Sequence, residues 1–389
     1  MREALPALRA QLRKQDELIV VDNHSSDGTV VAVRDVAPDA TVVEAGANLG
    51  FGAGCNSGAR AATGELLLFL NPDAVPATGF REAIGRPLVE GRGWAAWQGL
   101  VTAAGGNVIN TSGGVIHFTG IAWAGDAGEP LTAGGGREAA HPPPEEPTAT
   151  ALKKAATAAQ TPATAVKKAA MAAQAGADTV TAAPGEPAFV SGACLAIPRE
   201  WFQRVGGFAE DFFLYHEDVD LSLRLRLAGG RLGVARNAVV EHDYEFAKGS
   251  AKWRHLERNR WATLIRTYPS ALLAPLLPAL LATELALVPI SISGGWFREK
   301  VAAWGEVLGS LPRLLRERRA IQATRTIRAG EFARALSPDL KSPYLGGPAG
   351  SRVLRAVLRA YWSAVLAALG GSRSPVAPGA GDSGSRAAG

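Results

Sequence analysis

The sequence predicts an α/β fold: a Rossmann-like, mostly parallel sheet with helices on both faces, followed by a C-terminal helical extension. Short apolar runs rich in Val, Ile and Leu alternate with segments of helical composition. Runs that are apolar throughout are typical of parallel strands covered on both faces. The three N-terminal strand candidates are ELIVVDN (17–23), TVVEA (41–45) and ELLLFLNPDA (65–74).

Turn and glycine signals separate these strands. SSDGT (25–29) is a turn punctuated by Asp27-Gly28, and its Ser or Thr side chains are available to cap the helix that follows. GANLGFGAGCNSGARAATG (46–64) is a glycine-rich loop that enters a helix of small residues. The sheet is predicted to resume in EPAFVSGACLAIPREWFQRVGGF (186–208), as a strand followed by a short helix.

Composition leaves room for one large domain with extensions, or for two domains. The chain has 389 residues, of which 47% are apolar and 20% charged, so a packed core is feasible. Cys55 and Cys194 form neither a disulfide framework nor a metal-type spacing, which fits a reducing cytosol. The first twenty residues contain no apolar core segment, so we expect no signal peptide.

Charge is distributed unevenly along the chain. Residues 1–247 carry 20 basic and 28 acidic side chains, whereas residues 248–389 carry 21 basic and 8 acidic ones. The basic part includes the arginine cluster RLLRERRAIQATRTIR (313–328). It lacks a recognisable nucleic-acid-binding motif or an aromatic stacking platform, so nucleic acid is not the expected partner.

An apolar segment lies beside this cluster. ALLAPLLPALLATELALVPI (271–290) contains Glu284 as its only charge and is about long enough to cross a bilayer. Together with the arginines it predicts attachment to the anionic cytoplasmic face of the cell membrane. A buried helical hairpin with a solvated basic face is the alternative. Three prolines would interrupt a straight helix: Pro275, Pro278 and Pro289.

Residues 133–185 differ from their surroundings. TALKKAATAAQ (150–160) recurs as TAVKKAAMAAQ (164–174), a period of 14 residues without a wide apolar stripe. We interpret this region as an inserted helical or partly disordered linker. Residues 346–389 are expected to form an apolar helix near 352–369 and then a disordered tail rich in Gly, Ser, Pro and Ala.

The segment FFLYHEDVDLSLRLRL (212–227) places several acids directly after aromatic residues, which we interpret as a buried strand or strand end. A purely structural explanation is available, because acids favour a helix N-terminus and Asp220 can pair with Arg224. A chemical one is that desolvation raises the pKa of Glu217 or Asp218 and suits it to proton transfer. This segment alone leaves both open.

Polar residues at strand ends should converge in an open α/β sheet, where ligands collect at the carboxyl ends of strands. Asp22-Asn23 and Asp73 follow two predicted strands, and His242 follows the strand-like ARNAVVEH. An acid and a histidine in such positions are candidate ligands for a divalent cation. A histidine after an apolar strand is more often structural, so that alternative stays open.

Four motifs, taken together in order and spacing, resemble the inverting GT-A glycosyltransferases of family 2. The rhamnosyltransferase-like bacterial subgroup is the nearest. The resemblance covers about 22–130 and 186–265. The motifs are VVDNHSSDGT, NLGFGAGCNSGARAATGELLLFLNPDA, the run from FVSGACLAIPREWF to ARNAVVEH, and RNRW.

The resemblance implies a role for each matching position. Asp22 corresponds to the acid that contacts the base and ribose of the donor, next to Asn23. The loop that borders the nucleotide corresponds to Asn48, Gly50 and Asn56. The implied nucleotide-sugar-binding residues are Asp22, Asn23, Asn48, Gly50, Asn56, Asp73, Arg258 and Arg260, the two arginines reaching the diphosphate.

The implied metal and catalytic residues lie at the other motifs. Asp73 stands for the last acid of a metal-binding D-x-D whose first position is Asn71 here, and His242 is the additional ligand of Mg²⁺ or Mn²⁺. Asp218 corresponds to the catalytic base, with Glu217 supporting it. The cation would stabilise charge on the departing diphosphate while the base accepts the proton of the acceptor hydroxyl.

The expected function is therefore an inverting glycosyltransferase at the membrane. It would move a sugar, rhamnose from dTDP-rhamnose by subgroup similarity, to a cell-envelope glycan or lipid-linked acceptor. Galactofuranose, mannose or an N-acetylhexosamine would suit the same motifs. The predicted domains are 1–132 for the nucleotide-sugar, 133–185 as the insertion, 186–267 for acceptor and catalysis, 268–345 at the membrane, and 346–389 as helix and tail.

One departure from the family concerns the N-terminus. The family opens with a strand of the type V-x-V-x-I-x-T-x-N, whereas MREALPALRAQL matches the helix after it. Either the start was assigned too late or a central strand is lost, which would expose two unpaired edges. The loss would favour a second function, a catalytically inactive sugar-nucleotide-binding or scaffold protein. A soluble nucleotidyltransferase is a third reading, but it would need a phosphate-cradling Lys/Arg loop that the N-terminal region lacks.

Overall fold

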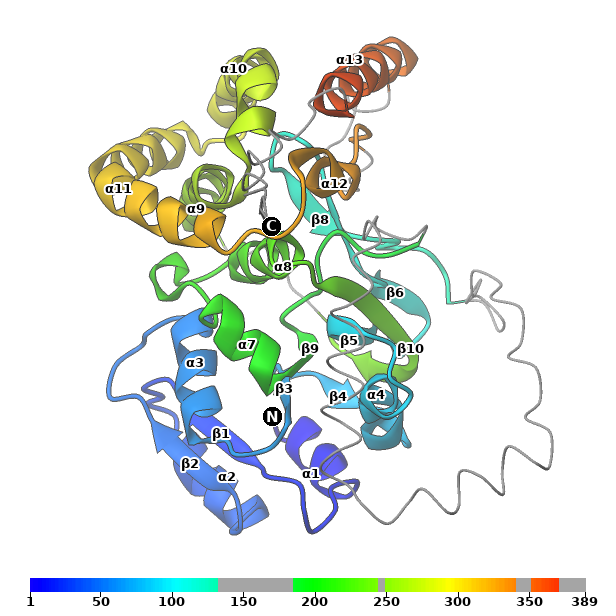
Figure 1. The fold of residues 1–389 in the computed structure, drawn as a ribbon. Coiled ribbons are helices and arrows are strands. Elements are labelled where there is room, and N and C mark those ends of the chain that lie inside the picture. Colours follow the sequence, from blue (N-terminus) through cyan, green and yellow to red (C-terminus); the bar gives the residue numbers. More distant parts are fainter. Residues whose placement is uncertain (132–184, 244–248, 341–350, 371–389) are drawn as a thin grey trace, which may run out of the picture.

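A six-stranded sheet forms the centre of the protein (Figure 1). The computed structural model describes residues 1–131, 185–243, 249–340 and 351–370. The strand order is β3-β9-β5-β10-β4, with β6 paired to β5. The strands are β3 (Leu66–Leu70), β4 (Val75–Pro76), β5 (Trp94–Ala103), β6 (Val108–Thr111), β9 (Cys194–Pro198) and β10 (Arg231–Glu241).

The sheet is mixed, and the prediction of a mostly parallel sheet is wrong. Only β5 and β10 pair in parallel, whereas β9 runs antiparallel to both β3 and β5, and β4 and β6 are also antiparallel to their partners. Parallel neighbours need a crossover connection, usually a helix. The strands before β9 in the chain, β7 (Gly114–Ile116) and β8 (Ala122–Ala124), pair with each other in a separate antiparallel sheet.

Helices cover both faces of this sheet, as predicted. Side chains of β9 alternate: Cys194 and Ala196 pack with α4 (Phe80–Val89). Leu195 and Ile197 pack on the opposite face. That second face is covered by α7 (Arg199–Val205), α8 (Glu217–Leu227) and the small-residue helix α3 (Phe51–Ala61). Period-2 alternation within a buried strand is what places apolar residues on both sides.

The first two predicted strands exist but form a sheet of their own. β1 (Ile19–Asp22) pairs in parallel with β2 (Thr41–Glu44). Within the described ranges this pair is not hydrogen-bonded to β3 or to any other strand of the six-stranded sheet. A separate small core forms under it, between α1 (Ala4–Arg9) and α2 (Thr29–Val36). Gly28, with φ +77°, precedes α2 as its cap, so Ser and Thr do not cap this helix as predicted.

The C-terminal part is helical, as predicted. It comprises α9 (Ala251–Thr267), α10 (Ser270–Ser293), α11 (Phe297–Ala323), α12 (Ala329–Arg334) and α13 (Arg352–Gly370). The predicted interruption of 271–290 is wrong, because α10 continues through Pro275, Pro278 and Pro289. Packing along one face supplies the stability that each interior proline removes.

These helices share a core with α8. Leu223 and Leu227 of α8 belong to the same buried cluster as Leu272 and Leu276 of α10. Trp362 of α13 stacks on Phe118, in the loop after β7 (Gly114–Ile116), with ring centroids 4.9 Å apart. The helical extension is therefore packed onto α8. The 14-residue repeat at 150–174 and the tail beyond 370 lie outside the described residues.

Candidate functional site

The glycine-rich loop is held by Asn23, the residue after β1. Its Nδ2 donates to Asn48 Oδ1 (3.2 Å) and to Gly50 O (3.1 Å), and its Oδ1 accepts from Leu49 N (2.9 Å). Asn48 Oδ1 also accepts from Gly50 N (3.1 Å). The structure thus brings Asn23, Asn48 and Gly50 together, and their binding of a nucleotide-sugar stays a prediction. The side-chain amide of Asn23 therefore holds the loop in shape through these hydrogen bonds.

Asp22 and Asn56 flank this loop, and both are buried but have different partners. The carboxylate of Asp22, 8% exposed at the end of β1, accepts from Ser25 N. Asn56 on α3 is buried, donates to Phe208 O (3.0 Å) and Glu210 Oε1 (3.0 Å), and accepts from Phe208 N (2.9 Å). Its side chain thus ties α3 to the Phe208 segment, which is a positioning arrangement. Nucleotide binding by either residue stays a prediction.

A carboxylate and an imidazole meet at the end of the six-stranded sheet. Asp73 Oδ1 lies 3.2 Å from His242 Nε2, and Asn71 Nδ2 lies 3.4 Å from the same nitrogen. The hydrogen bond from His242 holds the pKa of Asp73 below its usual range. Asp73 remains 63% exposed while His242 is 6% exposed. The Asp73 carboxylate is thus exposed to solvent, while the His242 imidazole that contacts it is buried.

The backbone around His242 fixes its position. His242 follows β10 directly, its N–H donates to Thr102 O on β5 (2.8 Å), and its carbonyl accepts from Asn110 Nδ2 on β6 (2.7 Å). Asp73 comes from the turn between β3 and β4, where Ala74 N donates to Asn71 O (3.0 Å). Residues 171 positions apart in the chain, Asn71 and His242, therefore meet on rigid elements.

These two ligands fit Mg²⁺ or Mn²⁺. Two ligand atoms at about 2.1 Å and 90° around an octahedral ion lie roughly 3 Å apart, which matches the Asp73–His242 separation of 3.2 Å. Across the described ranges no group of three or more His, Cys, Asp or Glu side chains is placed to hold a metal. Such cations commonly take one or two protein ligands and complete their shell with water and substrate phosphate oxygens.

The second acidic group opens α8. Asp218 Oδ2 accepts from Gly192 N (3.0 Å) and its Oδ1 from Val219 N (2.8 Å). Burial raises the pKa of Asp218, although these hydrogen bonds oppose the shift. Glu217 is 7% exposed, its Oε2 has no hydrogen-bond partner, and burial followed by the charge of Asp218 raises its pKa well above normal. Burial therefore favours the protonated form of both carboxyl groups.

The turn Ser191–Ala193 connects the two acidic groups. Gly192 N donates to Asp218, and the next residue, Ala193, accepts from Asn71 N (3.0 Å) beside the Asp73–His242 pair. Ser191 N donates to the fully buried Gln98 Oε1 (2.9 Å), which anchors the turn to β5. Residues 71–73, 218 and 242 therefore border one region of the molecule, at the end of β3 and the start of the antiparallel β9.

Asp220 has a structural role. It is fully buried and binds Arg224 Nε (2.7 Å) and Arg266 Nη1 (2.8 Å). The predicted pairing with Arg224 is confirmed. The acids of this segment therefore have different surroundings. Asp220 pairs with arginines, whereas Asp218 faces the Gly192 turn and Glu217 lies beside α3.

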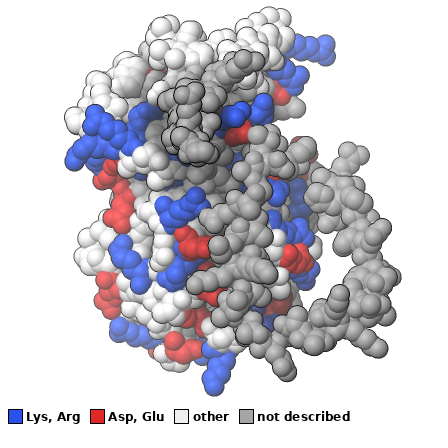
Figure 2. Space-filling model, viewed as in Figure 1, with Lys and Arg blue, Asp and Glu red and all other residues white. Residues whose placement is uncertain are grey.

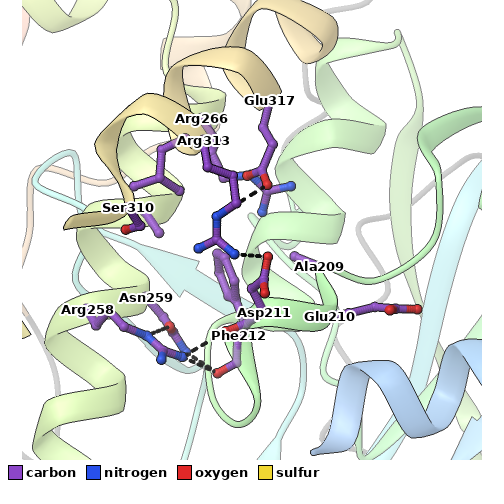
Figure 3. A pocket seen from close by; sticks show the side chains of 12 residues that line it. Ala209, Glu210, Asp211, Phe212, Arg258, Asn259, Arg266, Ser310, Arg313 and Glu317 are labelled. Atoms are coloured by element: carbon purple, nitrogen blue, oxygen red, sulfur yellow. Dashed lines mark hydrogen bonds and ion pairs between the residues drawn. The ribbon is translucent and has the colours of Figure 1, made fainter. Parts of the chain in front are cut away.

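The two arginines assigned to the diphosphate are engaged elsewhere. Arg258 donates through Nη2 to Asp211 O (3.0 Å) and Phe212 O (2.7 Å), beside a small cavity between α9, α11 and residues 209–212 (Figure 3). Arg260 is 2% exposed and binds Thr119 O, Glu257 and Glu284. In the described part of the chain neither forms an ion pair with Asp73 or Asp218, and their reach to a diphosphate stays a prediction.

The aromatic run before Glu217 is not a strand, which corrects the sequence interpretation. Glu210–Phe212 form a 3₁₀ turn, η1, and the chain then loops into α8. Asn259, which lies between the two arginines of RNRW, donates to the carbonyls of Phe212, Leu214 and Tyr215. The sequence prediction did not include Asn259, because the roles in RNRW were assigned to its arginine neighbours. The available signal was an uncharged amide within a charged helical segment.

Two family models match this chain. Glycosyl transferase family 2 matches residues 1–102, which contain the Asn23 loop and Asp73, and Glycosyl transferase family group 2 matches residues 155–302, which contain Asp218 and His242. The chain belongs to glycosyltransferase family 2. Membership accounts for the shared location of residues that the sequence separates widely.

Curated relatives of this family 2 chain include an N-acetylglucosaminyl-diphospho-decaprenol L-rhamnosyltransferase of Mycobacterium tuberculosis, found in two strains. It is 26% identical over 275 residues, covering 67% of this chain and 77% of the relative. The rhamnosyltransferase resemblance is thus present as a distant homology.

Three solved structures resemble this family 2 chain at low identity. GalNAc-T7 with UDP, GalNAc and Mn²⁺ has a TM-score of 0.45 at 13% identity, covering 69% of this chain but 45% of that one. The mannosyltransferase PcManGT of Pyrobaculum calidifontis with GDP-Man and Mn²⁺ has a TM-score of 0.40 at 19% identity, covering 86% and 81%. S. aureus TarS 1–349 with UDP has 0.46 at 14% identity, covering 95% and 86%.

Proposed function

We propose that this chain is a metal-dependent inverting glycosyltransferase that transfers a deoxyhexose from a nucleotide-sugar to a lipid-linked or cell-envelope acceptor at the membrane. One observation carries the proposal: the Asp73–His242 pair and the buried Glu217–Asp218 pair border the same turn, Ser191–Ala193. Such a turn separates two groups that act on opposite sides of one substrate.

Asp73 and His242 would hold the cation against the diphosphate of the donor. Bound there, Mg²⁺ or Mn²⁺ supplies charge neutralisation for the leaving group. The acceptor oxygen forms a bond to the anomeric carbon while the bond from that carbon to the phosphate oxygen breaks, and the nucleoside diphosphate leaves. The Asp218 carboxylate takes the hydroxyl proton. A single displacement of this kind inverts the anomeric centre.

The sugar and acceptor follow from the distant relative. Its name describes transfer of L-rhamnose to an N-acetylglucosaminyl-diphospho-decaprenol, and the match covers 67% of this chain. We therefore propose dTDP-rhamnose as donor and a lipid-linked or envelope glycan as acceptor. Asp22 and the Asn23-shaped loop would receive the nucleotide, since they lie at the carboxyl end of β1.

A membrane location is supported by the outer face of the C-terminal helices. α10 and α13 are each long and apolar enough to cross a bilayer by length and composition. Leu277, Leu281 and Leu285 form an exposed stripe on α10, each at least 62% exposed, and Val353 on α13 is 75% exposed. In Figure 2 this end of the molecule is mainly white, with Lys and Arg at its edges.

The opposite face of α10 indicates that the helix lies along the membrane surface rather than crossing it. Leu272, Leu276 and Leu280 are at most 3% exposed and pack with Leu223 of α8. The next turn of the same face carries Glu284, which pairs with Arg260 and with Lys300 Nζ (2.9 Å). A crossing α10 would carry the catalytic helix into the hydrocarbon. Docking of the exposed leucine face of α10 onto the cytoplasmic leaflet avoids that cost.

Vesicle binding tests the location. The triple substitution L277D/L281D/L285D should reduce co-sedimentation with phosphatidylglycerol-containing vesicles at least about tenfold, because each leucine stripe residue loses roughly 1.5 kcal/mol or more of apolar burial. Val89→Asp is the matched control, since Val89 is an 88% exposed apolar residue at the end of α4. Equal binding of both variants would remove this face as the docking surface.

Donor transfer tests the activity. Purified protein is supplied with Mn²⁺ or Mg²⁺, dTDP-rhamnose and other nucleotide-sugars, and an N-acetylglucosaminyl-diphospho-lipid, and the product anomer is determined by NMR. Transfer with inversion is expected. Retention would contradict the direct displacement, and transfer of a different sugar would change the donor alone. Nucleotide binding without any transfer would favour the inactive scaffold function.

A further inference from the structure

The segment between η1 and α8 has a backbone that bulky residues rarely adopt. Phe213 (φ +60°), Tyr215 (φ +69°) and His216 (φ +65°) all lie in the left-handed region. At Phe213, ψ is −60° and Leu214 N donates to Phe212 O (2.7 Å), which makes a γ-turn of the rare, strained kind. Three such residues directly before Glu217 require an external restraint.

Asn259 of α9 supplies that restraint. It is fully buried, and its Nδ2 donates to Phe212 O (2.9 Å), Leu214 O (2.9 Å) and Tyr215 O (2.7 Å). Its Oδ1 accepts from Arg258 Nε (2.9 Å), which sets the orientation of the amide. Figure 3 shows Arg258 and Asn259 side by side, to the left of Phe212. One side chain thus binds carbonyls on both sides of the γ-turn.

The same segment contacts both halves of the site. Phe51 N in the glycine-rich loop donates to Phe213 O (2.7 Å). A Cβ at Gly50 would come within 2.3 Å of that oxygen, so the two backbones are in direct contact. At its other end the segment leads through His216, the N-cap of α8, to Glu217 and Asp218. Its shape therefore fixes where α8 begins relative to the donor loop.

We propose that Asn259 is a positioning residue that holds residues 212–216 in their left-handed form and so aims Asp218 at the acceptor hydroxyl. This rests on the proposed function, in which Asp218 is the base. Asn259 acts through the loop and does not touch the substrate. A 1 Å misplacement of a base is sufficient to cost a large part of the rate.

Two substitutions and a control test the proposal. Asn259→Ala removes the amide, and Asn259→Asp keeps its size but replaces the donating NH₂ with an oxygen facing three carbonyls. Gln322→Ala is the control: its Nε2 on α11 donates to Thr267 O (2.8 Å) at the far end of α9. All three lose an amide that binds backbone carbonyls, and only the first two lose the loop contacts.

Both Asn259 variants should lower kcat about 10- to 100-fold while donor-nucleotide affinity changes less than about threefold. Asn23 holds the donor loop independently, which explains the small change in affinity. Chymotrypsin should cut after Phe212, Phe213 or Tyr215 at least about tenfold faster than in wild type, as mapped by mass spectrometry, because cleavage follows the population of the open loop.

The pH profile separates positioning from general destabilisation. A released loop admits water to Asp218, so the acid limb of kcat should move to lower pH. Glu217 is the titratable neighbour on α8, and the Ser191–Ala193 turn packed against Asp218 carries no ionisable side chain. Gln322→Ala should leave the limb, kcat and the chymotrypsin pattern unchanged.

Different failures have different meanings. Wild-type protein that transfers no sugar would overturn the proposed function, and the chymotrypsin comparison would still test whether Asn259 restrains the loop. If the wild type is active and Asn259→Ala has normal kcat and normal cleavage, only the positioning role of Asn259 is overturned. If Asn259→Ala does not fold, the Asn259→Asp variant decides the test. The proposal would also be overturned if chymotrypsin cut Asn259→Asp no faster than it cuts Gln322→Ala.

Discussion

Asp73 and Asp218 carry the same functional group, yet the structure gives them opposite surroundings. Asp73 is 63% exposed and its pKa is lowered by the hydrogen bond from His242. Asp218 lies against the Gly192 turn, and burial raises its pKa. Two carboxyl groups with pKa values moved apart are suited to different tasks. These surroundings suit the exposed carboxylate to its proposed role as a cation ligand and the buried one to its proposed role as the base.

The largest effect is expected when the buried carboxylate, Asp218, is replaced. Asp218→Asn should lower kcat roughly 10³-fold, because a general base contributes about that much, while donor binding stays within about twofold. Steady-state transfer and calorimetric nucleotide binding measure the two quantities separately. Unchanged turnover would exclude Asp218 as the base.

Removing the exposed side should give the reverse pattern. Asp73→Ala is expected to weaken Mn²⁺-dependent binding of the nucleoside diphosphate about 10- to 100-fold, because it removes one of the two proposed cation ligands. Calorimetry with and without the cation gives the metal-dependent part. Asp39→Ala is the matched control, as Asp39 is 69% exposed and paired with Arg9. Equal losses in both variants would mean that charge alone is responsible.

The acid limb of the rate profile should report the buried pair. Because Asp218 must be ionised and its pKa is raised, kcat should begin to fall at a pH above the ordinary carboxyl value of about 4. The charge of Asp218 raises the pKa of Glu217, so Glu217 is protonated where Asp218 titrates and Glu217→Gln should leave the limb unmoved. A limb that moves to lower pH in this variant would show that Glu217 carries a charge where Asp218 titrates.

The smallest effect is on stability. The raised pKa of Glu217 means that the folded protein holds this proton more tightly than the unfolded chain does. Its contribution to stability is therefore full at low pH and is lost as pH rises through the folded pKa. Glu217→Gln should raise the free energy of unfolding by about 1–3 kcal/mol at pH 8 and leave it unchanged near pH 4. Thermal melts at both pH values measure this difference.

Strand ends were predictable because they depend on local pattern. The apolar runs before Asp22 and Asp73, and the run before His242, all became strands or strand neighbours. Asp73 and His242 then meet at the six-stranded sheet, whereas Asp22 ends a strand of the separate β1–β2 pair. Strand direction was not predictable in the same way, because β9 is covered on both faces and reads as apolar whether it runs parallel or antiparallel.

The loop before Glu217 shows why the rest was hidden. Phe212, Phe213 and Tyr215 have strand propensity, and nothing local in their sequence indicates positive φ. The restraint comes from Asn259, 44 to 47 residues further along. Likewise the family resemblance assigned Arg258 and Arg260 to the diphosphate, whereas Arg260 is buried beside Glu257 and Glu284. Tertiary partners overrode the local signal in both cases.

The separation of β1–β2 from the six-stranded sheet has a consequence for exchange of backbone amides. A two-stranded sheet over a small core opens at lower free energy than a sheet covered by helices on both faces. Amides of Ile19–Asp22 should therefore exchange with deuterium well before those of Cys194–Pro198. Since Asp22 lies on this pair, a saturating nucleotide would slow that exchange by mass action and leave the larger sheet as it was.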